Sequence, residues 1–163
     1  MYQSKRIVIR EFLAAEKSIF CSFFDDEDVM QYLPRLQKAE YKNLFDDALN
    51  DYSLGPFGRW GIFETVNGNF IGNCLLRPFL EIPGQIEIGY SLSKLFWGRG
   101  IATEVAKALT AYGFAKTNTT EIVALTDFRN LGSQNVLKKS GFVQLENIIR
   151  KGVELNYFQI KRG

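Results

Sequence analysis

The sequence predicts a mixed α/β (α+β) protein in which helices flank one sheet, within a single domain that spans residues 1–163. Apolar residues recur at helical spacing before residue 53, and strand-like runs alternate with helical segments after residue 84. The composition fits this fold class, since 46% of the 163 residues are hydrophobic and 14 Phe, 7 Tyr and 2 Trp supply bulky side chains for a core.

The first third of the chain is expected to form one strand and two helices. Residues 5–10, with the sequence Lys-Arg-Ile-Val-Ile-Arg, have the composition of a short strand. Apolar side chains at helical spacing predict a first helix within residues 12–24 and a second within residues 35–52. The dipeptide Gly55-Pro56 ends the second helix.

The middle of the chain has the pattern of a β-meander. Trp60–Val66 and Asn69–Arg77 are strand-like runs, and the Asn67-Gly68 pair between them is a strong signal for a β-hairpin. A third run follows at Gln85–Leu92. Gly89 within it indicates either a bulge, which would separate this strand from its next neighbour, or a close approach of the backbone to another group.

Helices and strands alternate in the last part of the chain. Apolar spacing predicts a helix from Ile101 to Tyr112, and Glu121–Thr126 is strand-like. A further helix is expected over Asn130–Ser140 with Gly141 as its stop, and two final strands over Phe142–Ile148 and Glu154–Lys161. Together with the meander, this order predicts one mixed sheet.

The composition excludes several function classes. There is no histidine, which removes Ser-His-Asp and Cys-His triads and histidine-ligated metal sites. Cys21 and Cys74 lack the paired spacing of a metal or redox motif, so we expect no metal. The 20 Lys and Arg nearly balance the 18 Asp and Glu, which argues against a nucleic-acid partner. No apolar run is long enough for a membrane span and residues 1–6 show no signal-peptide core, so we expect a cytoplasmic protein.

A glycine-containing segment, Gly98-Arg99-Gly100-Ile101-Ala102-Thr103, stands between a predicted strand and a predicted helix. Glycines let an anion approach the backbone, and the start of a helix presents free N–H groups and the positive end of its dipole. The segment therefore indicates a pyrophosphate site that needs neither metal nor lysine, or else an ordinary turn. A Rossmann fingerprint would need glycine at Thr103, and the Gly-Lys-Ser/Thr of a P-loop is absent.

The strand before this loop adds a second feature. If a bulge separates it from its neighbour, its free backbone groups can pair with an extended ligand whose other end lies at the loop. Glu87 alternates with Ile86 and Ile88 and so projects to the opposite face of the strand. Glu87 is either a solvated strand residue or a group with a chemical role.

Four blocks of sequence, taken in order, closely resemble the GNAT N-acetyltransferases and most of all their RimJ/RimL-type branch. The blocks are Glu87-Ile88-Gly89-Tyr90, the run from Trp97 to Glu104, Asn130-Leu131-Gly132-Ser133 and Lys139-Ser140-Gly141-Phe142. The resemblance implies a GNAT-like acyl-CoA N-acyltransferase fold with a central, bulged, mostly antiparallel sheet flanked by helices. It also implies acetyl-CoA as cosubstrate.

The resemblance places the pyrophosphate of acetyl-CoA on the loop. Trp97 stands where the family usually has Arg or Gln, which implies a grip by backbone groups and Arg99. Asn130 matches a family residue near the cofactor arm, and it also suits a helix N-cap. The full set of residues implied to bind the cofactor is Ser91, Leu92, Trp97, Gly98, Arg99, Gly100, Ile101, Ala102, Thr103, Asn130 and Ser133.

The implied reaction is direct attack of a primary amine on the thioester within a ternary complex. A backbone N–H near Leu92 is the expected oxyanion donor, and Glu87 is the candidate base, directly or through water, unless water acts alone. Many family members have a tyrosine as the acid that protonates the thiolate, but that position is Leu137 here. Ser133, three residues after Asn130 as in RimL-like enzymes, is therefore the expected acid.

The acceptor is predicted only broadly. Acidic residues concentrate on the first two predicted helices, which usually border the acceptor side of this fold, and either attract a cationic amine or form a solvated face. They are Asp25, Asp26, Glu27, Asp28, Glu40, Asp46, Asp47 and Asp51. The candidates are a peptide or protein N-terminus, a polyamine or an aminoglycoside, acted on by a monomer or a homodimer. The alternative function is a non-catalytic acyl-CoA-binding or regulatory module.

Overall fold

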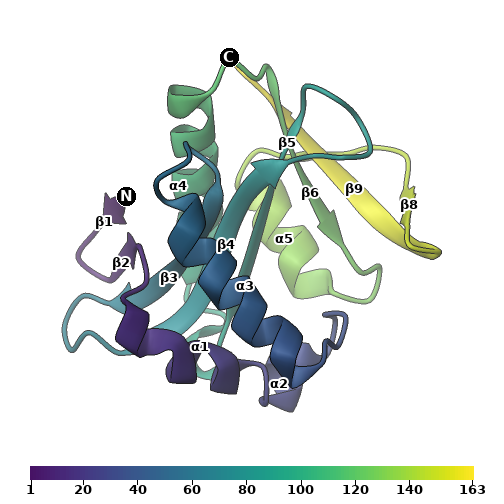
Figure 1. The fold of residues 1–163 in the computed structure, drawn as a ribbon. Coiled ribbons are helices and arrows are strands. Elements are labelled where there is room, and N and C mark those ends of the chain that lie inside the picture. The colour runs from purple at the N-terminus through teal and green to yellow at the C-terminus, as the bar shows by residue number, and fades with distance from the viewer.

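The computed structural model describes residues 1–163 and is organised around one mixed sheet (Figure 1). Eight strands lie in the order β1-β2-β3-β4-β5-β6-β9-β7, and β8 pairs with β9 outside this path. Only the β5–β6 pair is parallel. The strands are β1 (Tyr2–Gln3), β2 (Ile7–Arg10), β3 (Gly58–Glu64), β4 (Phe70–Pro78), β5 (Ile86–Leu92), β6 (Glu121–Thr126), β7 (Val143–Gln144), β8 (Ile148–Arg150) and β9 (Val153–Lys161).

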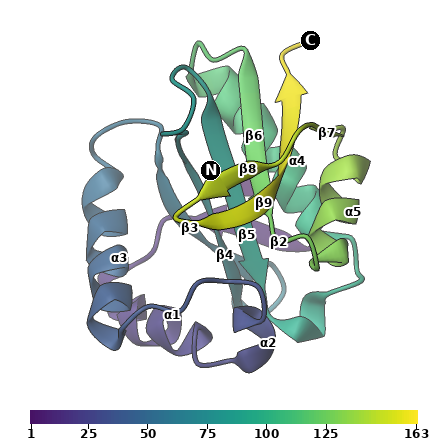
Figure 2. The ribbon, with the colours of Figure 1, turned by 90° about the vertical axis from the view of Figure 1, so that its right-hand side faces the viewer.

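Helices cover both faces of the sheet, so that in Figure 2 the strands stand between two groups of helices. α1 (Lys17–Phe23), α2 (Glu27–Met30) and α3 (Lys38–Asp51) lie on one side, and α4 (Ile101–Lys116) and α5 (Leu131–Lys139) lie on the other. None of these helices has both the length and the hydropathy needed to cross a membrane.

Two apolar clusters hold the helices to the sheet. The larger joins α4 and α5 to every second residue of the central strands, including Ile86, Ile88 and Leu92 of β5. The smaller is a group of packed phenylalanines that fixes α1 and α3 to the opposite face: Phe12, Phe20, Phe45 and Phe63. Because successive strand residues point to opposite faces, Glu87, Gly89 and Ser91 of β5 face the α3 side.

Most predicted elements are present, and the differences are local. The predicted strand over 142–148 is wrong: it divides into β7 and β8, so that β8 and β9 form a hairpin. The hairpin turns at Lys151 and Gly152, which have φ of 48° and 77°, as a two-residue turn requires. Part of the acidic run after the first helix forms α2, because the side chain of Asp26 accepts a hydrogen bond from the Asp28 N–H and caps it.

The bulge expected at Gly89 is absent from the β4–β5 pair, whose register runs without interruption from Gly72↔Leu92 to Pro78↔Ile86. The structure shows the alternative, a close approach of the Gly89 backbone to Leu75, since a Cβ at Gly89 would lie 3.2 Å from Cγ of Leu75. The irregularity of register lies instead between β3 and β4, at Ile62 and Phe63.

Candidate active site

The two central strands separate partway along their length. β5 pairs with β6 only at Ile86↔Ile122 and Glu87↔Val123. Beyond these residues β5 continues beside β4 to Leu92, whereas β6 continues beside β9. We call the separation between residues 89–92 of β5 and residues 124–126 of β6 the fork.

The hydrogen bonds at the two ends of the β4–β5 ladder show which backbone groups face the fork. Ser93 N donates to Ile71 O, and Phe79 N donates to Gln85 O. Hydrogen-bonded pairs alternate with non-bonded pairs in an antiparallel ladder, so the backbone of Ser91 is directed to β4. The groups directed to the fork belong to Tyr90 and Leu92, whereas those of Ser91, which the resemblance implied for the cofactor, are directed to β4.

The loop between β5 and α4 leaves its backbone open. Gly98 and Gly100 have φ of 70° and 75°, a left-handed conformation that glycine adopts without strain. A Cβ on Gly98 would meet no atom within 4 Å, and one on Gly100 would meet only Nη2 of Arg6, at 3.9 Å. The space beside both glycines is therefore available to a ligand.

The first turn of α4 supplies donors at this open space. The helix begins at Ile101, and its first backbone bond runs from Glu104 N to Gly100 O at 3.1 Å. The N–H groups of Ile101, Ala102 and Thr103 have no backbone acceptor, and Gly100 has no side chain to cap them. Unpaired amides and the positive end of the helix dipole together favour a phosphate group.

Two side chains hold this loop in place. Nη1 of Arg6 donates to the Arg99 carbonyl at 2.7 Å, and its Nε donates to the Glu104 carboxylate at 3.0 Å. The indole Nε1 of Trp97 donates to the Leu92 carbonyl at 2.8 Å, so Trp97 fastens the loop to the end of β5. Trp97 thus has a structural bond, and Arg6 is a loop contact that the sequence pattern missed.

A pair of hydroxyl groups lies between β5 and α5, on the α4 side of the sheet. Asn130 is the N-cap of α5, its Oδ1 accepting from the Ser133 N–H at 3.1 Å. Oγ of Ser133 lies 3.1 Å from the phenol oxygen of Tyr90. Burial raises the pKa of Tyr90, so the phenol keeps its proton at neutral pH. The sequence singled out Ser133 but missed Tyr90, which alternation places on the same face as Ile86 and Ile88.

Glu87 lies on the opposite face of β5, at the closed end of the fork. Its side chain is buried, and its two oxygens accept hydrogen bonds from Nε and Nη2 of Arg77 at 3.0 and 3.1 Å and from Nη1 and Nη2 of Arg150 at 2.9 and 3.0 Å. Arg150 also bonds Glu81, and these two carboxylates raise the pKa of Arg150. The solvated alternative for Glu87 is therefore wrong, and both of its oxygens already have cationic partners.

Most of the acidic residues on the first helices have local tasks. Asp26 and Glu40 cap helix starts, while Glu27, Asp28 and Asp46 form ion pairs. Their partners are Arg35, Lys94 and Lys17 respectively. Three of the eight carboxylates are thus neutralised by ion pairs within the protein, and the other five have no ion-pair partner.

Comparisons with known proteins agree with this geometry. A family model described as an acetyltransferase (GNAT) domain matches residues 6–143. An uncharacterized N-acetyltransferase named p20 from Bacillus licheniformis is 28% identical over 151 residues, which is 90% of this chain and 84% of that protein.

Solved structures show the same fold. A ribosomal-protein-S5-alanine acetyltransferase from Vibrio fischeri superimposes with a TM-score of 0.83 at 15% identity, covering 98% of this chain and 95% of the other. RimL, a ribosomal L7/L12 α-N-protein acetyltransferase in complex with coenzyme A, gives a TM-score of 0.80 at 16% identity, covering 97% and 95%.

Replacing Glu87 by Gln removes the carboxylate that separates two guanidinium groups. We expect the free energy of unfolding to fall by about 2 kcal/mol, because half-exposed Arg77 loses its carboxylate partner while Arg150 keeps Glu81. Urea denaturation measures this. The control is Glu27→Gln, which breaks an exposed pair with Arg35 and should change stability little. A loss at Glu87 no larger than that of the control would contradict the structural role.

Proposed function

This chain belongs to the GNAT acetyltransferase family, of the RimJ/RimL type, and is an acetyl-CoA-dependent N-acetyltransferase; we propose that a primary amine attacks the thioester directly at the fork, in a ternary complex. One observation supports this most: an open anion site at the start of α4 adjoins strand residues whose backbone groups lack a partner strand. A cosubstrate with a pyrophosphate at one end and an amide-containing arm at the other fits both parts.

The loop residues fit a pyrophosphate. The glycines provide a space that a side chain would fill, and the N–H groups of Ile101, Ala102 and Thr103 point out of the first turn of α4. Arg99 supplies a positive charge beside them. The amide groups of the pantetheine arm then pair with the backbone of Tyr90, as an added strand does at a sheet edge.

The backbone N–H of Leu92 is the proposed oxyanion donor. It points to the fork, whereas the Leu92 carbonyl is already occupied by Trp97. A fixed amide at this place stabilises the negative charge that develops on the thioester oxygen during attack, without reorganising in the process.

Ser133 is the proposed acid for the departing thiolate. Its hydroxyl lies 3.1 Å from the Tyr90 hydroxyl, which keeps its own proton and can replace the one that Ser133 gives up. The two hydroxyls form a short relay between β5 and α5.

Proton removal from the ammonium is assigned to water. Glu87 lies on the acceptor side of β5, but two arginines occupy its oxygens, so it does not act as a direct base in this proposal. It instead keeps Arg77 and Arg150 in position at the closed end of the fork. The water-mediated role of Glu87 remains compatible with this geometry.

The function is tested by an acetyl-transfer screen of amines that reads the release of free thiol from acetyl-CoA. Peptides with free N-termini, polyamines, aminoglycosides and amino acids form the panel. Amine-dependent thiol release is the expected result. Tight acetyl-CoA binding with no release for any amine would favour the alternative of a non-catalytic binding module.

Replacing Gly100 by Leu places a side chain in the proposed pyrophosphate space. We expect the Kd of acetyl-CoA to rise about 10-fold or more, because phosphate contacts to the amides are lost. Isothermal titration calorimetry measures this. Gly68→Leu is the matched control, since Gly68 has a φ of 71° and also has no neighbour within 4 Å of a Cβ. An unchanged Kd at Gly100 would place the pyrophosphate elsewhere.

Replacing Ser133 by Ala removes the proposed acid. We expect kcat to fall about 100-fold, the lower end for general acid catalysis because a thiolate leaves easily, with little change in the KM of acetyl-CoA. Steady-state kinetics measure both. Ser140→Ala is the control at the C-cap of the same helix, because the Ser140 hydroxyl donates only to the Val136 carbonyl. If Ser133→Ala keeps full activity and Tyr90→Phe does not, the acid is Tyr90.

A further inference from the structure

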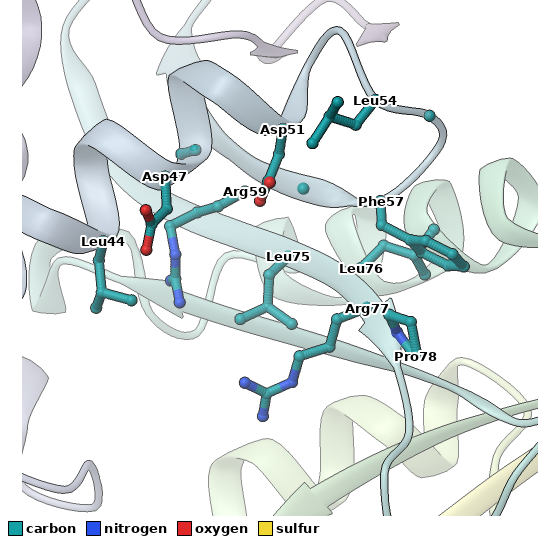
Figure 3. Close-up of a pocket in the computed structure, with 13 residues that line it drawn as sticks. Leu44, Asp47, Asp51, Leu54, Phe57, Arg59, Leu75, Leu76, Arg77 and Pro78 are labelled. Carbon is teal, nitrogen blue, oxygen red and sulfur yellow. The ribbon is translucent and has the colours of Figure 1, made fainter.

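A cavity of about 420 Å³ lies on the α3 side of the sheet, outside the loop and hydroxyl pair described above. Its helix wall includes Asp47 and Asp51 of α3, and its strand wall includes Arg59 of β3 with Leu75 and Arg77 of β4 (Figure 3). Figure 3 shows the two carboxylates projecting from the helix toward the strands, with Arg59 extending between them and β4.

Arg59 is the unusual residue of this cavity. Its guanidinium makes one hydrogen bond, from Nη1 to Oδ1 of Asn73 at 2.5 Å, and no carboxylate lies within 4 Å. Burial and the neighbouring charge of Arg77 lower the pKa of Arg59 to about 10. A partly desolvated cation without an ionic partner is costly, so this group favours the arrival of an anion.

Asn73 extends the polar surface toward β5. It is 2% exposed, and its Nδ2 donor has no hydrogen-bond partner although buried groups of this kind normally have one. In register it lies opposite Ser91, on the side of the sheet that faces α3. The cavity is thus linked to the acceptor side of the fork through Arg59 and Asn73.

The cavity is close enough to the fork for a small molecule to reach both. Arg59, Leu75 and Gly89 are register partners on three neighbouring strands, and Leu75 packs against Gly89 at the fork. Two strand spacings amount to about 10 Å. An amino acid or a short peptide, together with an extended arginine side chain, covers this distance.

The charges around the cavity select the kind of ligand. Asp47 and Asp51 form no ion pair, and they balance Arg59 and Arg77 in formal charge. Arg77 is shared with Glu87, which Arg150 also neutralises. A wall of carboxylates alone would favour a polyamine, and a wall of arginines alone would favour a polyanion. Facing walls of opposite charge favour a zwitterion.

We propose that this cavity is the acceptor subsite for a zwitterionic amine, an amino acid or short peptide, whose carboxylate binds Arg59 while its amine reaches the fork. The planar guanidinium forms paired hydrogen bonds with a carboxylate. Asp47 and Asp51, on the helix wall, then face a further cationic group of the ligand, such as a basic side chain of a peptide. This assignment rests on the function proposed above and narrows the acceptor classes that the sequence left open.

The test compares each acceptor with its carboxamide, which keeps the amine and loses the negative charge. Amino acids and dipeptides are assayed by thiol release, and we expect kcat/KM to be about 10- to 100-fold higher for the acid than for the amide. Arg59→Met should reduce this ratio to near one, and Arg59→Lys should reduce it less because the charge remains. Arg35→Met, which changes an exposed arginine outside the cavity, should keep the ratio of the unchanged protein.

A second readout separates the failure of the subsite from the failure of the proposed function. Calorimetry with the coenzyme-A-loaded protein measures binding of the acid and the amide without turnover. Equal activity on acid and amide, or a ratio that Arg59→Met leaves unchanged, overturns the subsite and leaves the transferase intact. Preferential binding of the acid with no thiol release supports the subsite and overturns the proposed function. If Arg59→Met does not fold, the acid-to-amide ratio of the unchanged protein and of Arg59→Lys decides the question.

Discussion

The site depends on an interruption of hydrogen bonding inside the sheet. β5 keeps its full ladder with β4, but its parallel pairing with β6 ends after two residue pairs. Buried backbone groups need partners, and here the protein itself supplies only one, the Trp97 indole on the Leu92 carbonyl. The remaining groups of Tyr90 and Leu92 are left for a ligand that offers amides of its own. The anion site at the start of α4 lies at the open end of the same fork, so one extended molecule can satisfy both.

The parts that the sequence predicted are those determined by neighbours along the chain. Gly98 and Gly100 indicated an open loop before a helix, Asn67-Gly68 indicated a hairpin, and Asn130 indicated a helix start. Each depends on a few consecutive residues, so local rules of geometry are sufficient. The mistaken strand over 142–148 shows the limit of this approach, because the turn at Lys151 and Gly152 is what assigns Ile148 to a separate hairpin.

The parts that the sequence missed depend on contacts between distant segments. Arg150 lies 63 residues from Glu87, and Tyr90 lies 43 residues from Ser133. No local sequence pattern predicts either contact. The acidic helices show the same limit, since the sequence does not show which of their carboxylates have ion-pair partners. Lys94, which pairs with Asp28, is 66 residues away. The sequence therefore showed how many acidic residues these helices carry, but it did not show the electrostatic potential that they produce at the site.

The alternation of side chains along β5 divides the site into two independent halves. Tyr90 faces α5 and meets Ser133, whereas Glu87 faces the α3 side and meets Arg77. The proposed thiol-releasing groups and the proposed acceptor groups thus belong to opposite faces of one strand, and no hydrogen bond joins the two sets. Substitutions around Arg59 can therefore change which amine is accepted while the anion loop and the hydroxyl pair stay in place. A fold built in this way can keep one cosubstrate and vary its acceptor, because each face of the strand is packed by different helices.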